Sequence, residues 1–105
     1  MAWVYLIIAG FFEIGWAIGM KYTHGFTKLV PSIFTLVSML ISVYLLSLAT
    51  KQINIGTAYA VWTGIGIAGT SVLGIILFQE PFEILKLLFI VLILIGIVGL
   101  KLIAN

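Results

Sequence analysis

The sequence contains no cysteine and no arginine, and charged residues make up only 8% of its 105 residues. Without cysteine the chain has no disulfide, no thiol nucleophile and no cysteine metal site. Its five lysines form no basic cluster, so we expect no nucleic-acid partner. The single histidine, His24, forms neither a metal cluster nor a catalytic pair by itself. We therefore expect neither an enzyme nor a bound metal or cofactor.

Hydrophobic residues make up 64% of the chain, whereas a soluble domain contains about half. They form long runs separated by short polar stretches, and a helix needs about 20 such residues to cross a bilayer. The sequence therefore predicts an all-α integral membrane protein, with one domain over residues 1–105. The fourth helix spans the lipid bilayer only if Lys86 and Lys101 extend to the two interfaces. We expect the four transmembrane helices at about residues 2–20, 29–49, 55–78 and 84–103.

The lysines give only a weak signal for orientation. Four spans place Lys51 and Lys101 on one side of the membrane and Lys21, Lys28 and Lys86 on the other. Because orientation follows the excess of lysine and arginine in short loops, a difference of one predicts insertion in both orientations. Many transporters contain inverted repeats, and this chain has no internal repeat. We therefore expect an antiparallel, dual-topology homodimer, in which the second copy supplies that symmetry.

Glu13 lies near the middle of the first expected helix. A charged side chain at this depth costs at least about 2.5–3.5 kcal/mol, and such residues normally have a function. The alternatives are a neutral, hydrogen-bonded structural glutamic acid or a side chain that reaches the interface. Glutamate is too short to reach water easily from this depth, so the sequence favours a functional carboxylate.

Aromatic residues accompany this carboxylate. Trp16 follows Glu13 by three residues, and Tyr59 and Trp62 have the same spacing in the third helix. Gly10 lies on the same face as Glu13 and allows a neighbouring helix to approach closely. Core packing explains each aromatic residue taken singly. Together they predict a site for a small cation, because a carboxylate pairs with the N–H groups of a planar guanidinium and an aromatic face attracts a cation.

Two further expectations concern how Glu13 works. Ser42, in the second helix, is a candidate to orient Glu13 by donating its hydroxyl, although a lone serine in a helix often bonds to its own backbone. Burial favours the neutral form of a carboxyl group, and a second Glu13 from a partner subunit increases the affinity for protons. Proton and cation would then compete, and competition at a site that faces one side at a time gives antiport. Gly96 and Gly99 suggest that the fourth helix mediates dimerisation.

Four short segments carry a resemblance to a known family. They are residues 13–17 (EIGWA), 21–26 (KYTHGF), 56–62 (GTAYAVW) and 62–66 (WTGIG). With its length and its four helices, the whole chain resembles the small multidrug resistance family, and Trp16 favours the guanidinium-exporter branch. The resemblance implies proton-coupled export of guanidinium cations across a bacterial inner membrane by two antiparallel subunits that share one Glu13 site. It implies that this site is lined by Gly10, Trp16, Ser42, Tyr59 and Trp62.

The chain departs from the family pattern at two positions outside this site. Lys28 stands where arginine is common, and Asn54 stands where proline usually precedes the third helix. These departures concern the geometry of the loops.

Three other functions stay open on the sequence. A multidrug exporter of the same family would respond selectively to a bulky quaternary ammonium. A proton-translocating ring subunit also carries a membrane carboxylate, but such subunits usually have fewer helices and would give the mass of a ring in detergent. An accessory membrane subunit would function unchanged with Glu13→Gln.

Overall fold

The structure is a computed structural model that describes residues 1–104, and every regular element in this range is an α-helix. All four helices are long and apolar enough to cross a membrane, which confirms the prediction of an all-helical membrane protein. The helix α1 continues to Tyr22, past the end expected near residue 20. The expected domain includes Asn105, which lies outside the described residues. The helices are α1 (Ala2–Tyr22), α2 (Leu29–Ala49), α3 (Ile55–Phe78) and α4 (Ile84–Ala104).

Local hydrogen bonds explain where α1 and α3 end. The buried Thr23 hydroxyl donates to the Met20 carbonyl at 2.7 Å and accepts from the Phe26 amide at 3.1 Å. These bonds satisfy polar groups that a helix end leaves unpaired. The chain then turns at Gly25, whose φ of 72° suits glycine. At the end of α3, Gln79 adopts the left-handed conformation, and its amide bonds to the Gly74 carbonyl.

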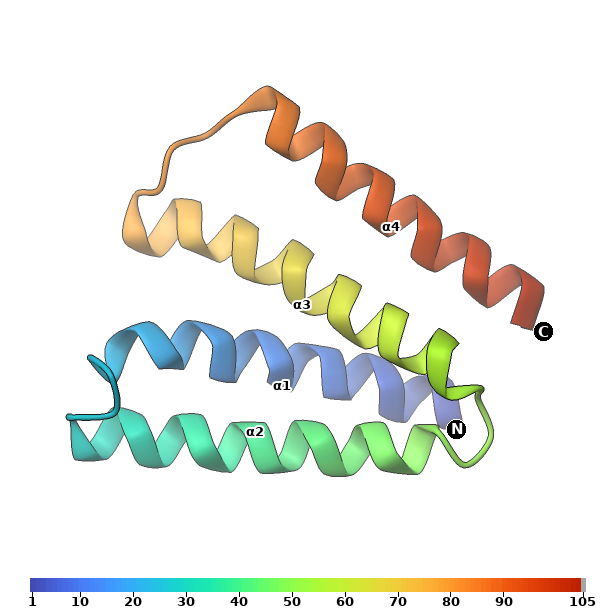
Figure 1. Ribbon diagram of the computed structural model, residues 1–105, viewed down its shortest axis with the longest axis horizontal. Coiled ribbons are helices and arrows are strands. Elements are labelled where there is room, and N and C mark those ends of the chain that lie inside the picture. Colours follow the sequence, from blue (N-terminus) through green and yellow to red (C-terminus); the bar gives the residue numbers. More distant parts are fainter. Residues whose placement is uncertain (105) are drawn as a thin grey trace.

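Helix α1 lies between α2 and α3 and packs against both, while α4 packs along α3 (Figure 1). From the end of α4, the Lys101 ammonium also lies 5.4 Å from the centre of the Trp3 ring of α1. Both chain ends lie at the same end of the molecule as the α2–α3 connection (Figure 1). The Cα atoms extend 42 × 34 × 16 Å, so the helices form a thin layer. A layer this thin leaves both of its broad faces open.

Small residues allow α1 to approach its neighbours. On the α2 side, a Cβ at Gly19 would lie 2.5 Å from the Thr35 hydroxyl oxygen, and Gly15 faces Ser38. The Ser38 hydroxyl donates to the Phe12 carbonyl at 3.0 Å, which fixes the two helices side by side. These contacts position the middle of α1, where Glu13 lies.

The apolar core is small and lies near one end of the layer. Its buried members come from the start of α1, the end of α2, the connection between α2 and α3, and the start of α3. Most large apolar side chains of α4 are exposed, as expected for a helix that faces lipid or another subunit. A Cβ at Gly96 or Gly99 would meet no atom of the described residues within 4 Å. The role of α4 in dimerisation therefore stays a prediction. The core residues are Ala2, Leu6, Ala9, Ala49, Ile53, Ala58, Val61 and Trp62.

Candidate functional site

The Glu13 side chain extends from the middle of α1 to the backbone of α3 at Gly66. Gly66 is buried, and a Cβ at this position would overlap the Glu13 carboxylate and lie 2.5 Å from its Cδ. Glycine at position 66 therefore leaves the space that the carboxylate occupies. The buried Oε1 atom of Glu13 has no hydrogen-bond partner among residues 1–104. A buried carboxylate oxygen without a donor is costly, so this atom is ready to bind a cation or a proton.

Trp16 lies one turn further along α1 and contributes a second unpaired polar group. Its indole Nε1 is buried and has no acceptor among the described residues. The ring packs against the apolar core. Its N–H group can only donate a hydrogen bond, and so it needs an acceptor. The structure thus places a free donor and a free acceptor on neighbouring turns of one helix.

Ser42 and Trp62 belong to a hydrogen-bond chain that joins three helices. The Trp62 indole N–H donates to the Ser42 hydroxyl at 2.9 Å, and this hydroxyl donates to the Ala9 carbonyl at 2.7 Å. Both side chains are buried. A hydroxyl has one hydrogen to donate, and that of Ser42 goes to Ala9. In this arrangement Ser42 therefore does not orient Glu13, which differs from the expectation from the sequence. The close approach of α1 and α2 brings the Ala9 carbonyl within its reach instead.

Tyr59 lies next to Trp62 on α3, with the two ring centroids 5.5 Å apart and the rings tilted by 53°. Its side chain is 57% exposed, in a groove between α2 and α3. Seven residues separate Tyr59 from Gly66, so the two share a face of α3 about two turns apart. Tyr59 therefore lies on the face of α3 that contacts Glu13, but about two turns away from the carboxylate.

Gly10 is buried against α3. A Cβ at Gly10 would lie 2.7 Å from Cγ2 of Ile65 and 2.9 Å from its Cβ. In the single chain this glycine therefore allows close packing of α1 on α3.

The structure thus brings Gly10, Glu13, Ser42 and Trp62 into the contacts between α1, α2 and α3. These residues do not form a complete cage around a cation. Within residues 1–104 the Glu13 carboxylate accepts no hydrogen bond from Trp16, Ser42, Tyr59 or Trp62.

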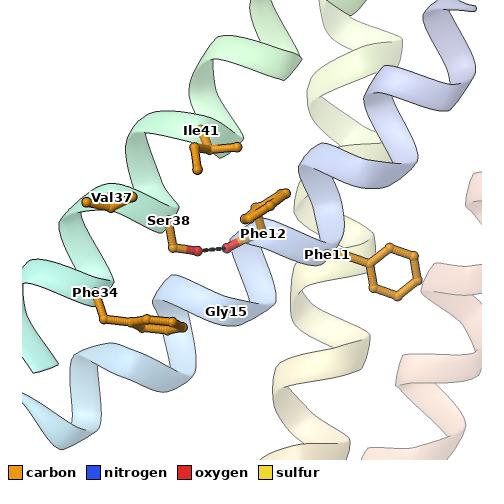
Figure 2. Close-up of a pocket in the computed structure, with 7 residues that line it drawn as sticks. All are labelled: Phe11, Phe12, Gly15, Phe34, Val37, Ser38 and Ile41. Atoms are coloured by element: carbon orange, nitrogen blue, oxygen red, sulfur yellow. Dashed lines mark hydrogen bonds between the residues drawn. The ribbon is translucent and has the colours of Figure 1, made fainter.

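A cavity of about 310 Å³ between α1 and α2 does not contain this carboxylate. In Figure 2 the ring of Phe34 lies close to Gly15, the ring of Phe12 lies further along α1 toward Ile41, and the Ser38 hydroxyl points to the Phe12 carbonyl. Glu13 is not among the residues that line it, and no charged group does so. The cavity is therefore a poor site for a cation. Its lining residues are Phe11, Phe12, Gly15, Phe34, Val37, Ser38 and Ile41.

Two buried hydroxyls of α3 were not among the residues expected from the sequence. The Thr63 and Thr70 hydroxyl oxygens have no hydrogen-bond partner in the described part of the chain. They lie three residues before and four residues after Gly66, so all three share one face of α3. Their spacing around a glycine in an apolar helix was the only signal that the sequence offered.

Most of the remaining charges lie at the ends of the helices. Lys21 pairs with Glu80 at 3.4 Å, and its ammonium lies 4.6 Å from the centre of the Phe78 ring. Both charged side chains are partly exposed, so this pair adds little stability. No group of three or more histidine, cysteine or acidic residues lies close enough to hold a metal within residues 1–104.

Comparison with known proteins identifies relatives over nearly the full length. Residues 1–93 match the family model described as Small Multidrug Resistance protein. The chain is 58% identical to a guanidinium exporter of Yersinia pseudotuberculosis serotype I (strain IP32953), over 97% of this chain and 98% of the relative. It is 54% identical to a guanidinium exporter of Proteus vulgaris, over the same shares. It is 50% identical to a guanidinium exporter of Escherichia coli (strain K12), over 97% of each chain.

Proposed function

Because the chain belongs to the Small Multidrug Resistance family, it is a membrane transporter rather than an enzyme, and we propose that it is a proton-coupled antiporter that exports guanidinium and small substituted guanidinium cations. The observation that carries this proposal is the Glu13 carboxylate in the middle of α1, which lies against Gly66 of α3 and whose buried Oε1 atom has no hydrogen-bond partner among residues 1–104. The similarity to guanidinium exporters supports guanidinium as the cation.

The chemistry of Glu13 suits this substrate. A carboxylate and a guanidinium form two parallel N–H···O bonds, which are stronger than bonds between neutral groups. The other two glutamates, Glu80 and Glu83, lie in the connection between α3 and α4, which leaves Glu13 as the acid within the spans. The Trp16 ring, one turn from Glu13 along α1, would add cation–π attraction once the site is closed to water.

Competition for Glu13 would couple the two fluxes. A protonated carboxyl is neutral and cannot pair with a cation, so Glu13 binds either a proton or guanidinium. Each pH unit across the membrane corresponds to about 1.36 kcal/mol, and each charge to about 2.3 kcal/mol per 100 mV. Exchange of two protons for one guanidinium carries net positive charge inward, so the membrane potential would help to drive export.

The working unit we propose is an antiparallel homodimer in a bacterial inner membrane. The near balance of lysines on the two sides supports both orientations, and the relatives come from bacteria. The single chain is a layer 16 Å thick, with Tyr59 and most large apolar side chains of α4 exposed. A second copy placed over this layer would enclose the Glu13 face and contribute its own Glu13, Tyr59 and Trp62.

Proteoliposomes test this function directly. An outward guanidinium gradient is applied to vesicles that contain a pH-sensitive dye, with wild-type protein, Glu13→Gln or the loop control Glu83→Gln. We expect guanidinium to drive proton movement through the wild type and the control but not through Glu13→Gln. A response to a bulky quaternary ammonium but not to guanidinium would instead identify a multidrug exporter. A response that survives Glu13→Gln would contradict the role of this carboxylate.

A further inference from the structure

We propose that the hydroxyls of Thr63 and Thr70 complete the guanidinium site and select cations that carry N–H groups over those that do not. This inference rests on the proposed function, because it adds a recognition element to the same Glu13 site. It begins from the two buried hydroxyl oxygens of α3 that have no partner within residues 1–104.

Their position relative to Glu13 follows from the helix geometry. The Glu13 carboxylate lies against Gly66, and Thr63 and Thr70 are the neighbours of Gly66 one turn away on either side. Residues three or four apart on a helix have Cβ atoms about 5–6 Å from each other. Thr63 and Thr70 therefore flank Gly66 along α3 on the two sides of the place that the Glu13 carboxylate occupies, and the glycine between them provides its space.

Thr63 and Thr70 lack the local hydrogen bond that several other hydroxyls of this chain make. A hydroxyl in a helix usually bonds to a carbonyl of the preceding turn. Several others in this chain do so: Ser32 bonds to the Lys28 carbonyl at 2.5 Å, Ser47 to the Tyr44 carbonyl at 2.6 Å, and Thr50 to the Ser47 carbonyl at 2.8 Å. Thr63 and Thr70 have no such bond, although their oxygens are buried. Their hydroxyls are thus free to bind another group beside Glu13.

Guanidinium can donate hydrogen bonds to such hydroxyls. It is planar and carries N–H donors along all of its edges, while one carboxylate occupies a single edge. A buried N–H without an acceptor loses its bonds to water without replacement. Hydroxyl oxygens can accept these remaining bonds. A fully alkylated cation has no N–H and gains nothing from them, so the two threonines favour guanidinium.

The chain offers a matched control at Thr35. Its hydroxyl is also buried and unpartnered among the described residues, but it lies against Gly19 in the α1–α2 contact. The substitutions Thr63→Val, Thr70→Val and Thr35→Val each replace one hydroxyl by a methyl of similar size. Thr63→Ser and Thr70→Ser keep the hydroxyl and serve as rescue variants.

Equilibrium binding of guanidinium and of tetramethylguanidinium to the purified full-length protein, at one pH, tests the inference. We expect Thr63→Val and Thr70→Val each to weaken guanidinium binding about tenfold or more, as for a hydrogen bond to a charged group. Tetramethylguanidinium, which has lost most of its N–H groups, should change by less than about twofold. The serine variants and Thr35→Val should bind guanidinium as the wild type does.

The inference would be overturned by equal loss for both cations, by the same loss in Thr35→Val, or by failure of the serine variants to restore affinity. If a valine variant does not fold, the serine variant and an alanine variant at that position give the same comparison. Wild-type protein that binds no guanidinium would remove the proposed function as well. Normal guanidinium binding by both valine variants would remove only the selection by Thr63 and Thr70.

Discussion

Replacing Gly66 by alanine places a methyl group where the Glu13 carboxylate lies. The new Cβ would overlap the carboxylate, with Cδ of Glu13 only 2.5 Å away. Normal contacts between carbon atoms are about 3.5–4.0 Å, so the carboxylate must move by about 1 Å or more. The end of a glutamate side chain can make this movement, and the fold should therefore change little.

A shift of this size affects binding more than stability. An N–H···O bond of about 2.9 Å becomes too long when one partner moves by about 1 Å. Hydrogen bonds to charged groups contribute about 1.5–3 kcal/mol, so Gly66→Ala should weaken guanidinium binding by about 10- to 100-fold. Calorimetric titration of the purified protein measures the affinity, and thermal unfolding in detergent measures the stability.

The control for this substitution lies on the same helix. A Cβ at Gly56 would meet no atom of residues 1–104 within 4 Å, so Gly56→Ala should bind guanidinium as the wild type does. If Gly66→Ala also binds guanidinium with wild-type affinity, the carboxylate does not bind the cation at the position it occupies against α3. The proposed cation site at Glu13 and Gly66 would then be refuted.

Other substitutions test the packing around the site and the arrangement in the membrane. Trp62→Phe removes the indole donor and should lower stability by about 1 kcal/mol, with a similar coupling energy to Ser42→Ala in a double-mutant cycle of unfolding. Gly10→Ala places a Cβ 2.9 Å from the branched Cβ of Ile65 and should destabilise the protein by about 1–3 kcal/mol, whereas Gly56→Ala, whose Cβ would meet no atom of residues 1–104 within 4 Å, should not. Thermal unfolding measures both. A reporter fused to the C-terminus should appear on both sides of the membrane, and its presence on one side only would exclude the dual-topology homodimer.

The helices were predictable because lipid imposes a simple requirement on the chain. Runs of about 20 apolar residues form helices in a bilayer, where every backbone polar group must be bonded within the segment. The sequence singles out Glu13 as a candidate functional residue for the related reason that a charge at this depth is costly. Neither inference needs knowledge of which helices touch.

The contacts between helices were not predictable from the sequence. A helix that is apolar on all sides gives no sign of which face is buried. The contact of Glu13 with Gly66, the acceptor of the Ser42 hydroxyl and the position of Thr63 and Thr70 all depend on how α1, α2 and α3 pack against one another. Only the spacing of small and hydroxyl residues along α3 indicated which face of α3 is buried.

Competition between protons and guanidinium at Glu13 is the central claim, and the pH dependence of guanidinium binding tests it most directly. If protonated Glu13 cannot bind the cation, the apparent affinity should fall as the pH is lowered, by up to about tenfold per pH unit for each proton displaced. Protons should be released when guanidinium is added, and Glu13→Gln should abolish both effects. Guanidinium binding that releases no protons and keeps the same affinity at every pH would contradict the account.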